Sequence, residues 1–446
     1  MRDNLTELIF SAGVVGCGGA GFPTHKKVCG QVEDFIVNGV ECEPLLRTDR
    51  YIMAHYAREL VETVAAIGAF LQAKRRVIGV KRAYAPQVEA LEAAIRETGA
   101  AVELHLLESF YPAGDEQVLV HEVTGRTVPP GGIPLAVGAV VDNAATVLAI
   151  HDAVAGKPLT DKYLSVAGRV PKPSVLHVPV GTSFAECVAL AGGELGEGDF
   201  IVAGGPMMGR SMTWDQAKRE VVTKTTSGIL VLPADGAHAQ RYQLSVEKML
   251  NRARSACIQC SYCTQLCPRY LLGHPLRPNR IMRKLSMGAI PELLEDEDVK
   301  AAQLCCECGV CELYACPMGL APRRVNQMVK GELAKAGIRS KFTGGDTDPD
   351  REVRKAPTRK AAARAGVLEY YDWEPGEAVE YTPKRVEIPV KMHIGAPSQP
   401  LVAVGDRVER GQLIARCPEG AMGAQIHASI AGVVAAVGDR IVIESR

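Results

Sequence analysis

Two ordered sets of cysteines, which hold most of the 14 cysteines of this chain, constrain its fold more than any other feature. The first set follows the pattern C-x2-C-x2-C-x3-C-P and comprises Cys257, Cys260, Cys263, Cys267 and Pro268. The second set has one extra residue before its last cysteine and comprises Cys305, Cys308, Cys311, Cys316 and Pro317. In runs of this kind three closely spaced thiolates hold one [4Fe-4S] cluster, and the remote fourth cysteine ligates the other cluster.

The spacing therefore predicts two [4Fe-4S] clusters with exchanged fourth ligands. The ligands expected for one cluster are Cys257, Cys260, Cys263 and Cys316. Those expected for the other are Cys305, Cys308, Cys311 and Cys267. Cys306, inside the second set, is not expected to be a ligand, although the extra residue before Cys316 leaves room for a shifted register.

Structural zinc and disulfide bonds are weaker interpretations of the same cysteines. Zinc sites generally use two separated C-x2-C pairs, so a third cysteine at the same spacing and a following proline have no role in them. Cysteine-dense disulfide scaffolds are usually short secreted chains, whereas this chain has 446 residues. The other cysteines, Cys17, Cys29, Cys42, Cys187 and Cys417, lack cluster spacing and are expected to be small buried hydrophobic residues.

Composition limits the function classes. Lysine plus arginine and aspartate plus glutamate both total 51, so the net charge of zero gives no support to nucleic-acid binding. We see no signal-peptide pattern at the N-terminus, and the most apolar stretch, 133–150, is interrupted by Asp142 and Asn143. Thiolate-ligated clusters without an export signal indicate a cytoplasmic setting.

The first third of the chain predicts a parallel α/β sheet. Strands are expected at 35–37, 77–80 and 102–107, with helices at 50–73 and 86–98 between them. A glycine-rich loop, 16–21, precedes the first strand, and glycines of this kind let the backbone approach a phosphate or a planar ring. Polar residues gather where the first strand ends, which is where open α/β sheets bind ligands.

Four separated motifs carry a family resemblance. They are the glycine loop with Phe22-Pro23-Thr24 and Lys27, then Asn38 with Glu41 and Glu43-Pro44, then Tyr111 with Gly114, Asp115 and Glu116, then Asn143 with Thr146. In this order they resemble the flavin-binding NADH dehydrogenase subunit of respiratory complex I and the C subunit of the Rnf electron-transport complex. The FMN-contacting positions that this resemblance implies are Gly16, Gly18, Gly19, Gly21, Lys27, Asn38, Glu41, Glu43 and Asn143, together with Asp115, Glu116 and Thr146.

The implied chemistry suits these residue types. Lys27 and backbone amides would neutralise the FMN phosphate, and Asn38 and Asn143 would hydrogen-bond the flavin. The acidic pair Asp115 and Glu116 would meet hydroxyls of NADH; the alternative is that the acids of these motifs are solvated loop residues. One departure is Cys17, where the flavin-binding proteins of complex I usually carry arginine.

The whole chain is expected to be multidomain α/β and α+β. The expected regions are an FMN/NADH-binding domain at 1–158, a β-grasp domain at 159–235, a helical ferredoxin module at 244–337, a linker at 338–385 and a barrel-sandwich domain at 386–446. The last resembles biotinyl and lipoyl carriers without their modified lysine. Arg269, Arg277, Arg280, Arg283 and Lys284 form a basic group expected near the first cluster.

This domain order and the opening motifs most closely resemble the cobalamin reductases of the propanediol-utilisation microcompartment. The resemblance implies NADH as electron donor, FMN and two [4Fe-4S] clusters as cofactors, and cobalamin as acceptor. A cobalamin adenosyltransferase and a shell protein would be partners inside a cytoplasmic microcompartment. Two alternatives stay open: a peripheral subunit of an Rnf-type membrane complex, and an electron-relay protein without flavin.

Overall fold

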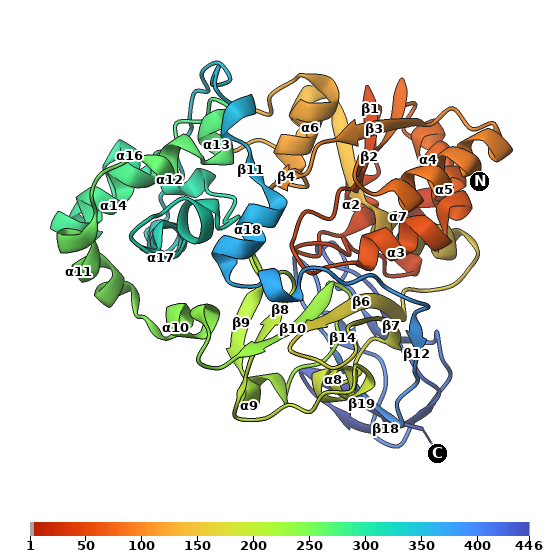
Figure 1. Cartoon of the computed structure of the whole chain (residues 1–446). Coiled ribbons are helices and arrows are strands. Elements are labelled where there is room, and N and C mark those ends of the chain that lie inside the picture. The colour runs from red at the N-terminus through yellow and green to blue at the C-terminus, as the bar shows by residue number, and fades with distance from the viewer. Residues whose placement is uncertain (1–3, 289, 446) are drawn as a thin grey trace.

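The computed structural model describes residues 4–288 and 290–445. Figure 1 shows an N-terminal α/β region in red and orange, a β-rich region in yellow-green, a helical module in green and cyan, and a C-terminal β region in blue. The light-blue segment that carries helix α18 (Thr358–Ala365) lies in the middle, between the helical module and the other regions. No helix of the described chain combines the length and the apolar character that a membrane crossing requires.

The N-terminal region is built on a parallel sheet, as the sequence predicted, and its strand order is β3-β2-β1-β5, with β5 added to the three predicted strands. Its strands are β1 (Asp34–Gly39), β2 (Arg75–Lys81), β3 (Glu103–Leu107) and β5 (Ala139–Asn143). In the register of β1 and β5, Asn38 pairs with Asn143. Because parallel strands end at the same edge of a sheet, these two predicted flavin residues lie side by side.

Helices cover both faces of this sheet. They are α1 (Leu5–Ser11), α2 (Thr24–Lys27), α3 (Thr48–His55), α4 (Ala57–Phe70), α5 (Ala85–Thr98), α6 (Glu116–Thr124) and α7 (Ala144–Val154), with a short 3-10 turn, η1 (Pro134–Val137). The single helix expected over 50–73 is wrong, because Tyr56 leaves the helical region (φ −126°, ψ 32°) and separates α3 from α4. The hydroxyl groups of Tyr56 and Tyr163 lie 2.6 Å apart, so the break anchors the N-terminal region to the next one.

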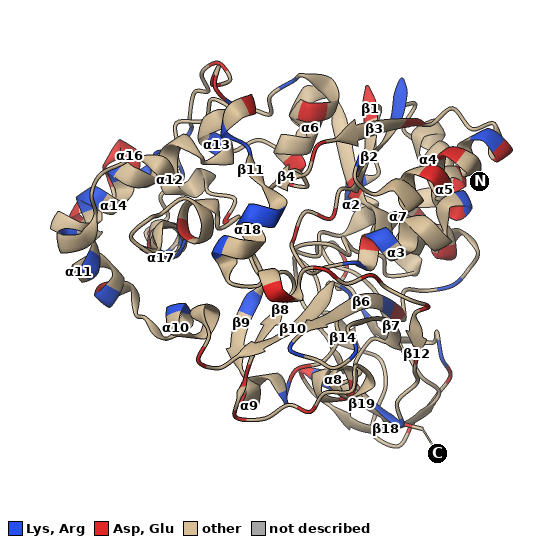
Figure 2. Ribbon diagram, in the orientation of Figure 1, with Lys and Arg blue, Asp and Glu red and all other residues tan. Residues whose placement is uncertain are grey.

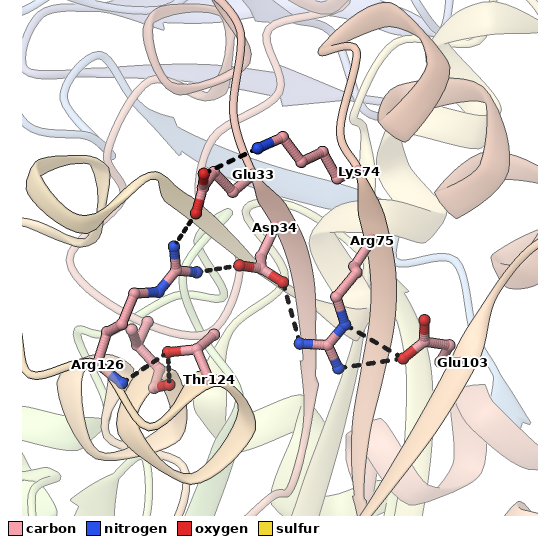
Figure 3. A network of polar contacts seen from close by, with 8 residues as sticks. Glu33, Asp34, Lys74, Arg75, Glu103, Thr124 and Arg126 are labelled. Carbon is pink, nitrogen blue, oxygen red and sulfur yellow. Dashed lines mark hydrogen bonds and ion pairs between the residues drawn. The ribbon is translucent and has the colours of Figure 1, made fainter.

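An ion-pair network closes the opposite edge of the sheet, where β1, β2 and β3 begin (Figure 3). Asp34, which is buried, pairs with both Arg75 and Arg126. Arg126 also pairs with Glu33, and the outer members of the network are Lys74 and Glu103. This edge is therefore filled with satisfied charges, and the carboxyl ends of the strands remain for ligand binding.

The second region is a six-stranded sheet with the order β12-β7-β6-β10-β8-β9. Its strands are β6 (Asp161–Gly168), β7 (Ser174–Pro179), β8 (Asp199–Ala203), β9 (Arg210–Thr213), β10 (Gly228–Pro233) and β12 (Val379–Glu380), and its helices are α8 (Phe184–Leu190) and α9 (Trp214–Ala217). Ser183 caps α8 through a capping box with Glu186. His177 lies on β7, where it stacks on Tyr163 and contacts Glu380, in keeping with a structural role.

The cysteine sets lie in a helical module, as predicted. Its elements are α10 (Ala237–Gln243), α11 (Val246–Ala256), α12 (Tyr262–Gln265), α13 (Pro268–Leu271), α14 (Pro278–Met287), α15 (Ile290–Leu293), α16 (Glu297–Lys300), η2 (Ala301–Leu304), the π-turn η3 (Val310–Tyr314) and α17 (Pro322–Lys335). Its core contains apolar residues from α14 and α17, among them Ile281, Leu285, Val325 and Val329.

Residues 338–385, expected to be a linker, instead fold back onto the other regions. Strand β11 (Ala356–Pro357) pairs with β4 (Phe110–Tyr111), and β12 adds an edge to the second sheet. Between them α18 buries Ala361, Ala362 and Ala365, and the turns η4 (Glu352–Arg354) and η5 (Leu368–Tyr370) flank this helix. The sequence did not predict this helix because its buried face consists of Thr358 and three alanines, which give a weak apolar periodicity among charged residues.

The C-terminal region is a sandwich of two antiparallel sheets, β13-β19-β18-β15 and β14-β16-β17. Its strands are β13 (Arg385–Pro389), β14 (Gln399–Pro400), β15 (Arg407–Val408), β16 (Leu413–Arg416), β17 (Ile426–His427), β18 (Gly432–Val437) and β19 (Arg440–Glu444). Isoleucines from both sheets, including Ile388, Ile414, Ile426 and Ile441, fill the space between them. This is the barrel-sandwich architecture that the sequence predicted.

Candidate functional site

A cavity of about 420 Å³ opens at the carboxyl ends of β1 and β5. The predicted residues that line it are Gly16, Gly18, Gly19, Gly21, Lys27, Asn38, Glu116, Asn143 and Thr146. Apolar walls complete the lining, from Ile133, Pro134 and Leu135 on one side and Val140 and Val141 on another. A mixed lining of this size is typical of sites for small organic cofactors.

The glycine loop needs its glycines for close approach. A Cβ atom on Gly18 would lie 2.9 Å from the side chain of Asn143, and Gly21 has φ +73° with Thr225 at 2.9 Å from such an atom. A Cβ on Gly19 would meet nothing within 4 Å, so this backbone faces open space at the cavity. The loop thus presents bare peptide groups to whatever occupies the cavity.

Side chains at the strand ends hold this loop in place. Asn143 caps α7 by accepting from the Ala145 N–H at 3.0 Å, and its Nδ2 donates to Asp49 at 2.7 Å. The Cys17 N–H donates to Thr146 Oγ1 at 2.9 Å. Asn38 Nδ2 donates to the Gly114 carbonyl at 2.8 Å. The N-terminus of α7 and the glycine loop therefore share one hydrogen-bonded frame.

Lys27 faces two carboxylates across the cavity. Its Nζ donates to Glu116 Oε1 at 2.9 Å and lies 3.6 Å from Asp142 Oδ1. The two carboxylates raise the pKa of Lys27 despite its desolvation, so it stays charged. Burial raises the pKa of Asp142 to about 6, and its second oxygen, Oδ2, has no hydrogen-bond partner within the described chain.

Three predicted flavin contacts lie outside the cavity lining. Glu41 accepts from the N–H groups of Asp49 and Arg50 in the first turn of α3, at 2.9 and 3.1 Å. Glu43 accepts from the Met207 N–H at 2.9 Å and from Tyr111 Oη at 3.1 Å. Asp115 caps α6, and its carboxylate points to the helical module. The family resemblance implied flavin contacts for these acids; in this structure their carboxylates accept hydrogen bonds from protein donors.

The cavity suits FMN on these observations. Bare glycine peptides and a charged lysine match a phosphate, the apolar walls match a planar ring, and the unpartnered oxygen of Asp142 is an acceptor for a polar group of the ligand. Asp142 was missed as a site residue. Its place at the end of a strand, next to Asn143, was the signal that could have identified it.

The first cysteine set encloses a cavity of about 230 Å³. Its thiols are Cys257, Cys260, Cys263 and Cys316, the grouping that the spacing predicted for one cluster. Every residue of its lining belongs to 257–322. The Leu320 N–H donates to Cys316 Sγ at 3.3 Å, a contact that favours a thiolate at this position.

The second set surrounds a smaller cavity, which contains Cys267, Cys305, Cys306, Cys308 and Cys311. The four predicted ligands are together, and Cys306 lies with them. The Glu307 N–H donates to Cys305 Sγ at 3.4 Å. Asn326 is fully buried in this lining, and within the described residues neither polar atom of its side chain meets the hydrogen-bond criteria with a partner, so both could serve a cluster or its thiolates.

The two cysteine loops share a backbone shape. Gln259 and Ser261, on either side of Cys260, have φ +54° and +65°. Glu307 and Gly309, on either side of Cys308, have φ +61° and +78°. Three of these residues are not glycine, and each costs about 1 kcal/mol in this conformation. Within the described residues no three His, Cys, Asp or Glu side chains converge as a single metal ion requires.

Burial disfavours the thiolate form of two of the predicted ligands, Cys263 and Cys267. Burial raises the pKa of Cys263 to about 12, with smaller contributions from the neighbouring thiols, and burial also raises that of Cys267. Iron must therefore displace protons as the clusters load. Among the cysteines without cluster spacing, Cys17, Cys187 and Cys417 are buried as expected, whereas Cys29 is exposed.

The expected basic group near the first cluster is divided and largely neutralised. Figure 2 shows basic residues of α14 beside acidic residues of α16. Arg280 contacts Asp298 at 3.4 Å, and Lys284 contacts Asp296 at 2.7 Å. Arg269 is buried against the N-terminal region instead. Another cavity, of about 680 Å³, lies behind Cys17 and between α7 and β6, and none of the predicted site residues lines it.

Four domain families match the chain in the order of these regions. The Nuo51 FMN-binding domain matches residues 9–152, the SLBB domain 163–211, the 4Fe-4S dicluster domain 256–321 and the RnfC barrel sandwich hybrid domain 377–446. A flavin-binding domain joined to a dicluster module defines a flavin and iron–sulfur oxidoreductase of electron transport, with FMN and two [4Fe-4S] clusters as cofactors.

Relatives make the family more specific. The cobalamin reductase PduS of Salmonella typhimurium is 40% identical over 99% of this chain and 96% of that protein, and PduS of Citrobacter freundii is 39% identical over 97% and 94%. The chain belongs to the cobalamin reductase family. The C subunit of the proton-translocating ferredoxin:NAD(+) oxidoreductase complex of Clostridium ljungdahlii is 35% identical over 59% of this chain and 55% of that protein. In fold, an NAD+-reducing [NiFe]-hydrogenase chain is similar over 74% of this chain and 62% of its own, with a TM-score of 0.50 at 20% identity.

Proposed function

We propose that this protein transfers electrons from NADH to a corrinoid, cob(III)alamin, through FMN and two [4Fe-4S] clusters. The observation that supports this most is the juxtaposition of a flavin-type cavity with a thiol cavity across one domain contact. Tyr111 and Glu43, of the flavin domain, reach Cys308 and Met207 there. The similarity to cobalamin reductases over nearly the full length of both chains supports the acceptor.

We assign the binding of FMN to residues that line the flavin cavity. Lys27 and the glycine-loop amides would bind the phosphate, and Asn38, Asn143, Thr146 and Asp142 would hold polar atoms of the flavin. Bound FMN supplies the conversion between a two-electron hydride and single electrons. Glu41, Glu43 and Asp115 are assigned to the frame around the cavity and not to the ligand.

The cysteine ligands are assigned as the spacing predicts. We place one cluster on Cys257, Cys260, Cys263 and Cys316, and the other on Cys267, Cys305, Cys308 and Cys311. The electrons balance if one NADH gives NAD+, a proton and two electrons. Two electrons reduce one cob(III)alamin to cob(I)alamin, or two cob(III)alamin to cob(II)alamin.

We also propose a setting and partners for this activity. A cytoplasmic microcompartment, with a cobalamin adenosyltransferase and a shell protein as neighbours, fits a reductase that renews the corrinoid for a B12-dependent enzyme. A second candidate is a peripheral subunit of an ion-translocating complex, favoured by the identity to Rnf-type C subunits. The shared segment there is only 59% of this chain, so we prefer the first.

The test is an anaerobic titration of protein reconstituted with iron, sulfide and FMN. NADH should bleach the flavin and cluster absorbance, and added cob(III)alamin should restore it. For each NADH consumed, one cob(III)alamin should become cob(I)alamin, or two should become cob(II)alamin. Lys27→Met should lower FMN affinity about tenfold, since it removes the charge of a lysine that lines the flavin cavity beside the glycine loop. Lys157→Met, at a 73% exposed lysine away from the flavin cavity, is the matched control.

The outcomes separate the candidates. Bleaching by NADH without recovery on cobalamin would overturn the acceptor and favour a subunit that serves another carrier. Protein that binds no FMN but whose clusters are reduced by another donor would favour an electron-relay protein.

A further inference from the structure

A buried ion pair joins the helical module to the N-terminal region. Arg269 donates to both carboxylate oxygens of Asp115, with NH1–Oδ1 at 2.6 Å and NH2–Oδ2 at 3.0 Å. The side chains are only 9% and 13% exposed. A bidentate pair of this geometry fixes both distance and orientation, and it is shielded from salt.

Each end of this pair is tied to a different cofactor site. Asp115 caps α6, accepting from the N–H groups of Gln117 and Val118 at 3.1 Å each, and the next residue, Glu116, lines the flavin cavity. Arg269 lies two residues after Cys267, in α13. A short path of covalent and hydrogen bonds therefore links the flavin cavity to Cys267, which lines the second cavity.

Arg269 also acts on the second set directly through its charge. A guanidinium stays protonated in proteins, so Arg269 keeps its positive charge although it is buried, two residues from Cys267 and paired with Asp115. Tyr111 adds a second link, since its buried hydroxyl donates to the Cys308 carbonyl at 2.7 Å. At the first cavity the corresponding contact comes from α18 and not from the N-terminal region: Arg364 donates to the Cys316 carbonyl at 3.2 Å.

We propose that Arg269 is a positioning and tuning residue: through Asp115 it holds the second cysteine set against the flavin domain, and its guanidinium raises the reduction potential of the cluster held there. The proposal rests on the proposed function for the presence of that cluster. In this arrangement the cluster of the second cavity accepts electrons from the flavin. The cluster of the first cavity then passes them to the external acceptor. A positive charge beside a cluster favours the reduced form, which carries one more negative charge.

Removing the charge of Arg269 and removing the charge of Asp115 should shift the reduction potential of the second cluster in opposite directions. Removing the charge of Arg269 leaves Asp115 as a buried negative charge, so reduction becomes harder. Removing the charge of Asp115 leaves the guanidinium uncompensated, so reduction becomes easier. Asparagine also caps helices well, so Asp115→Asn keeps the start of α6 intact. A merely structural contact would not produce shifts of opposite sign.

The experiment is a redox titration of the reconstituted full chain, followed by electron paramagnetic resonance, with chemical mediators and neither NADH nor cobalamin. At a fixed potential, Arg269→Gln should lower the ratio of reduced to oxidised second cluster on the order of tenfold, and Asp115→Asn should raise it. Arg269→Lys, which keeps the charge, should stay near wild type. Arg283→Gln, at an exposed arginine of the first cavity, is the control and should leave the second cluster unchanged.

The outcomes are decisive for the proposal. Shifts of opposite sign in the second cluster support it, and equal shifts, or none, overturn it. If Arg269→Gln does not load the second set, Asp115→Asn decides: a rise supports the tuning role, and no change or a fall overturns it. Failure of the wild type to oxidise NADH or reduce cobalamin would count against the proposed function alone, because the titration uses neither.

Discussion

The two cysteine sets have nearly the same spacing and the same loop shape, but they lie in different surroundings. In the second cavity Cys267, Cys308 and Cys311 are 6–7% exposed, and Tyr111 of the N-terminal region donates to the Cys308 carbonyl. The first cavity opens to the surface, where Ile258 is 63% and Tyr262 is 51% exposed. Spacing thus specifies a cluster, whereas the fold around it specifies what the cluster can exchange electrons with.

The difference suggests a direction for electron flow. A cluster enclosed between domains is reached by a cofactor of the same chain, and an exposed one is reached by a separate acceptor. Solvent and nearby charges also shift cluster potentials, so the two sites are expected to differ in potential although their ligands are alike. Matched substitutions at the two sites should therefore have different effects on electron transfer.

Removing one ligand from each set should give the largest difference. Cys311→Ala and Cys260→Ala should each lose about four of about eight iron atoms per chain. After NADH, the Cys260 variant should show a reduced second cluster, whereas the remaining cluster of the Cys311 variant should stay oxidised. Electron paramagnetic resonance measures this, and dithionite, which should reduce the remaining cluster in both, is the control. Equal reduction by NADH in both variants would contradict the order of the sites.

Removing the tyrosine link should loosen only the second set. Tyr111→Phe leaves the buried carbonyl of Cys308 without its donor, at a cost of about 1–3 kcal/mol. Amide hydrogen exchange of residues 310–314 in the loaded protein should become faster accordingly. Tyr84→Phe is the matched control, because its hydroxyl donates to the Glu41 carbonyl at 3.1 Å inside the N-terminal region. A similar acceleration in the control would show that the effect is not specific to the domain contact.

The second site should also respond to pH through Glu43. Burial raises the pKa of this carboxyl from 4.5 to about 7, so the folded protein favours its neutral form. The stability that this preference contributes is complete below pH 4.5 and is lost as pH rises through 7, by about 3 kcal/mol in total. Glu43→Gln should match wild type near pH 5 and melt at a higher temperature at pH 8. A difference between the two melting temperatures that does not change with pH would refute this.

Much of this architecture was predictable because its signals are local. The cysteine spacing grouped Cys316 with the first set and Cys267 with the second, and the structure brings both groups together. Alternating strands and helices correctly predicted the parallel sheet, and the motifs at its strand ends predicted most of the flavin cavity. The ligand assignments themselves stay predictions.

The errors concern contacts between distant segments. Asp115 follows a strand end, as ligand residues do, but its partner Arg269 is 154 positions away, and no local pattern pairs them. The carboxylate of Glu43 likewise accepts a hydrogen bond from the Met207 N–H, which belongs to another domain. Helix α18 was missed because alanines carry too weak a periodic signal for a buried face. Burial and tertiary partners, which decide these cases, are properties of the fold and not of the motif.

The smallest expected effect concerns the mouth of the first cavity. Ile258→Ser should change the stability by less than about 0.5 kcal/mol, because the side chain is mostly exposed. It should nevertheless slow the reoxidation of the reduced clusters by cob(III)alamin a few-fold, since a corrinoid that docks there would cover this apolar side chain. Anaerobic stopped-flow absorbance measures the rate, and Val353→Ser, at a valine 84% exposed and outside both cavities, is the control. Equal rates in both variants and wild type would mean that the acceptor docks at another surface, and the contrast between an enclosed and an outlet cluster would lose its functional meaning.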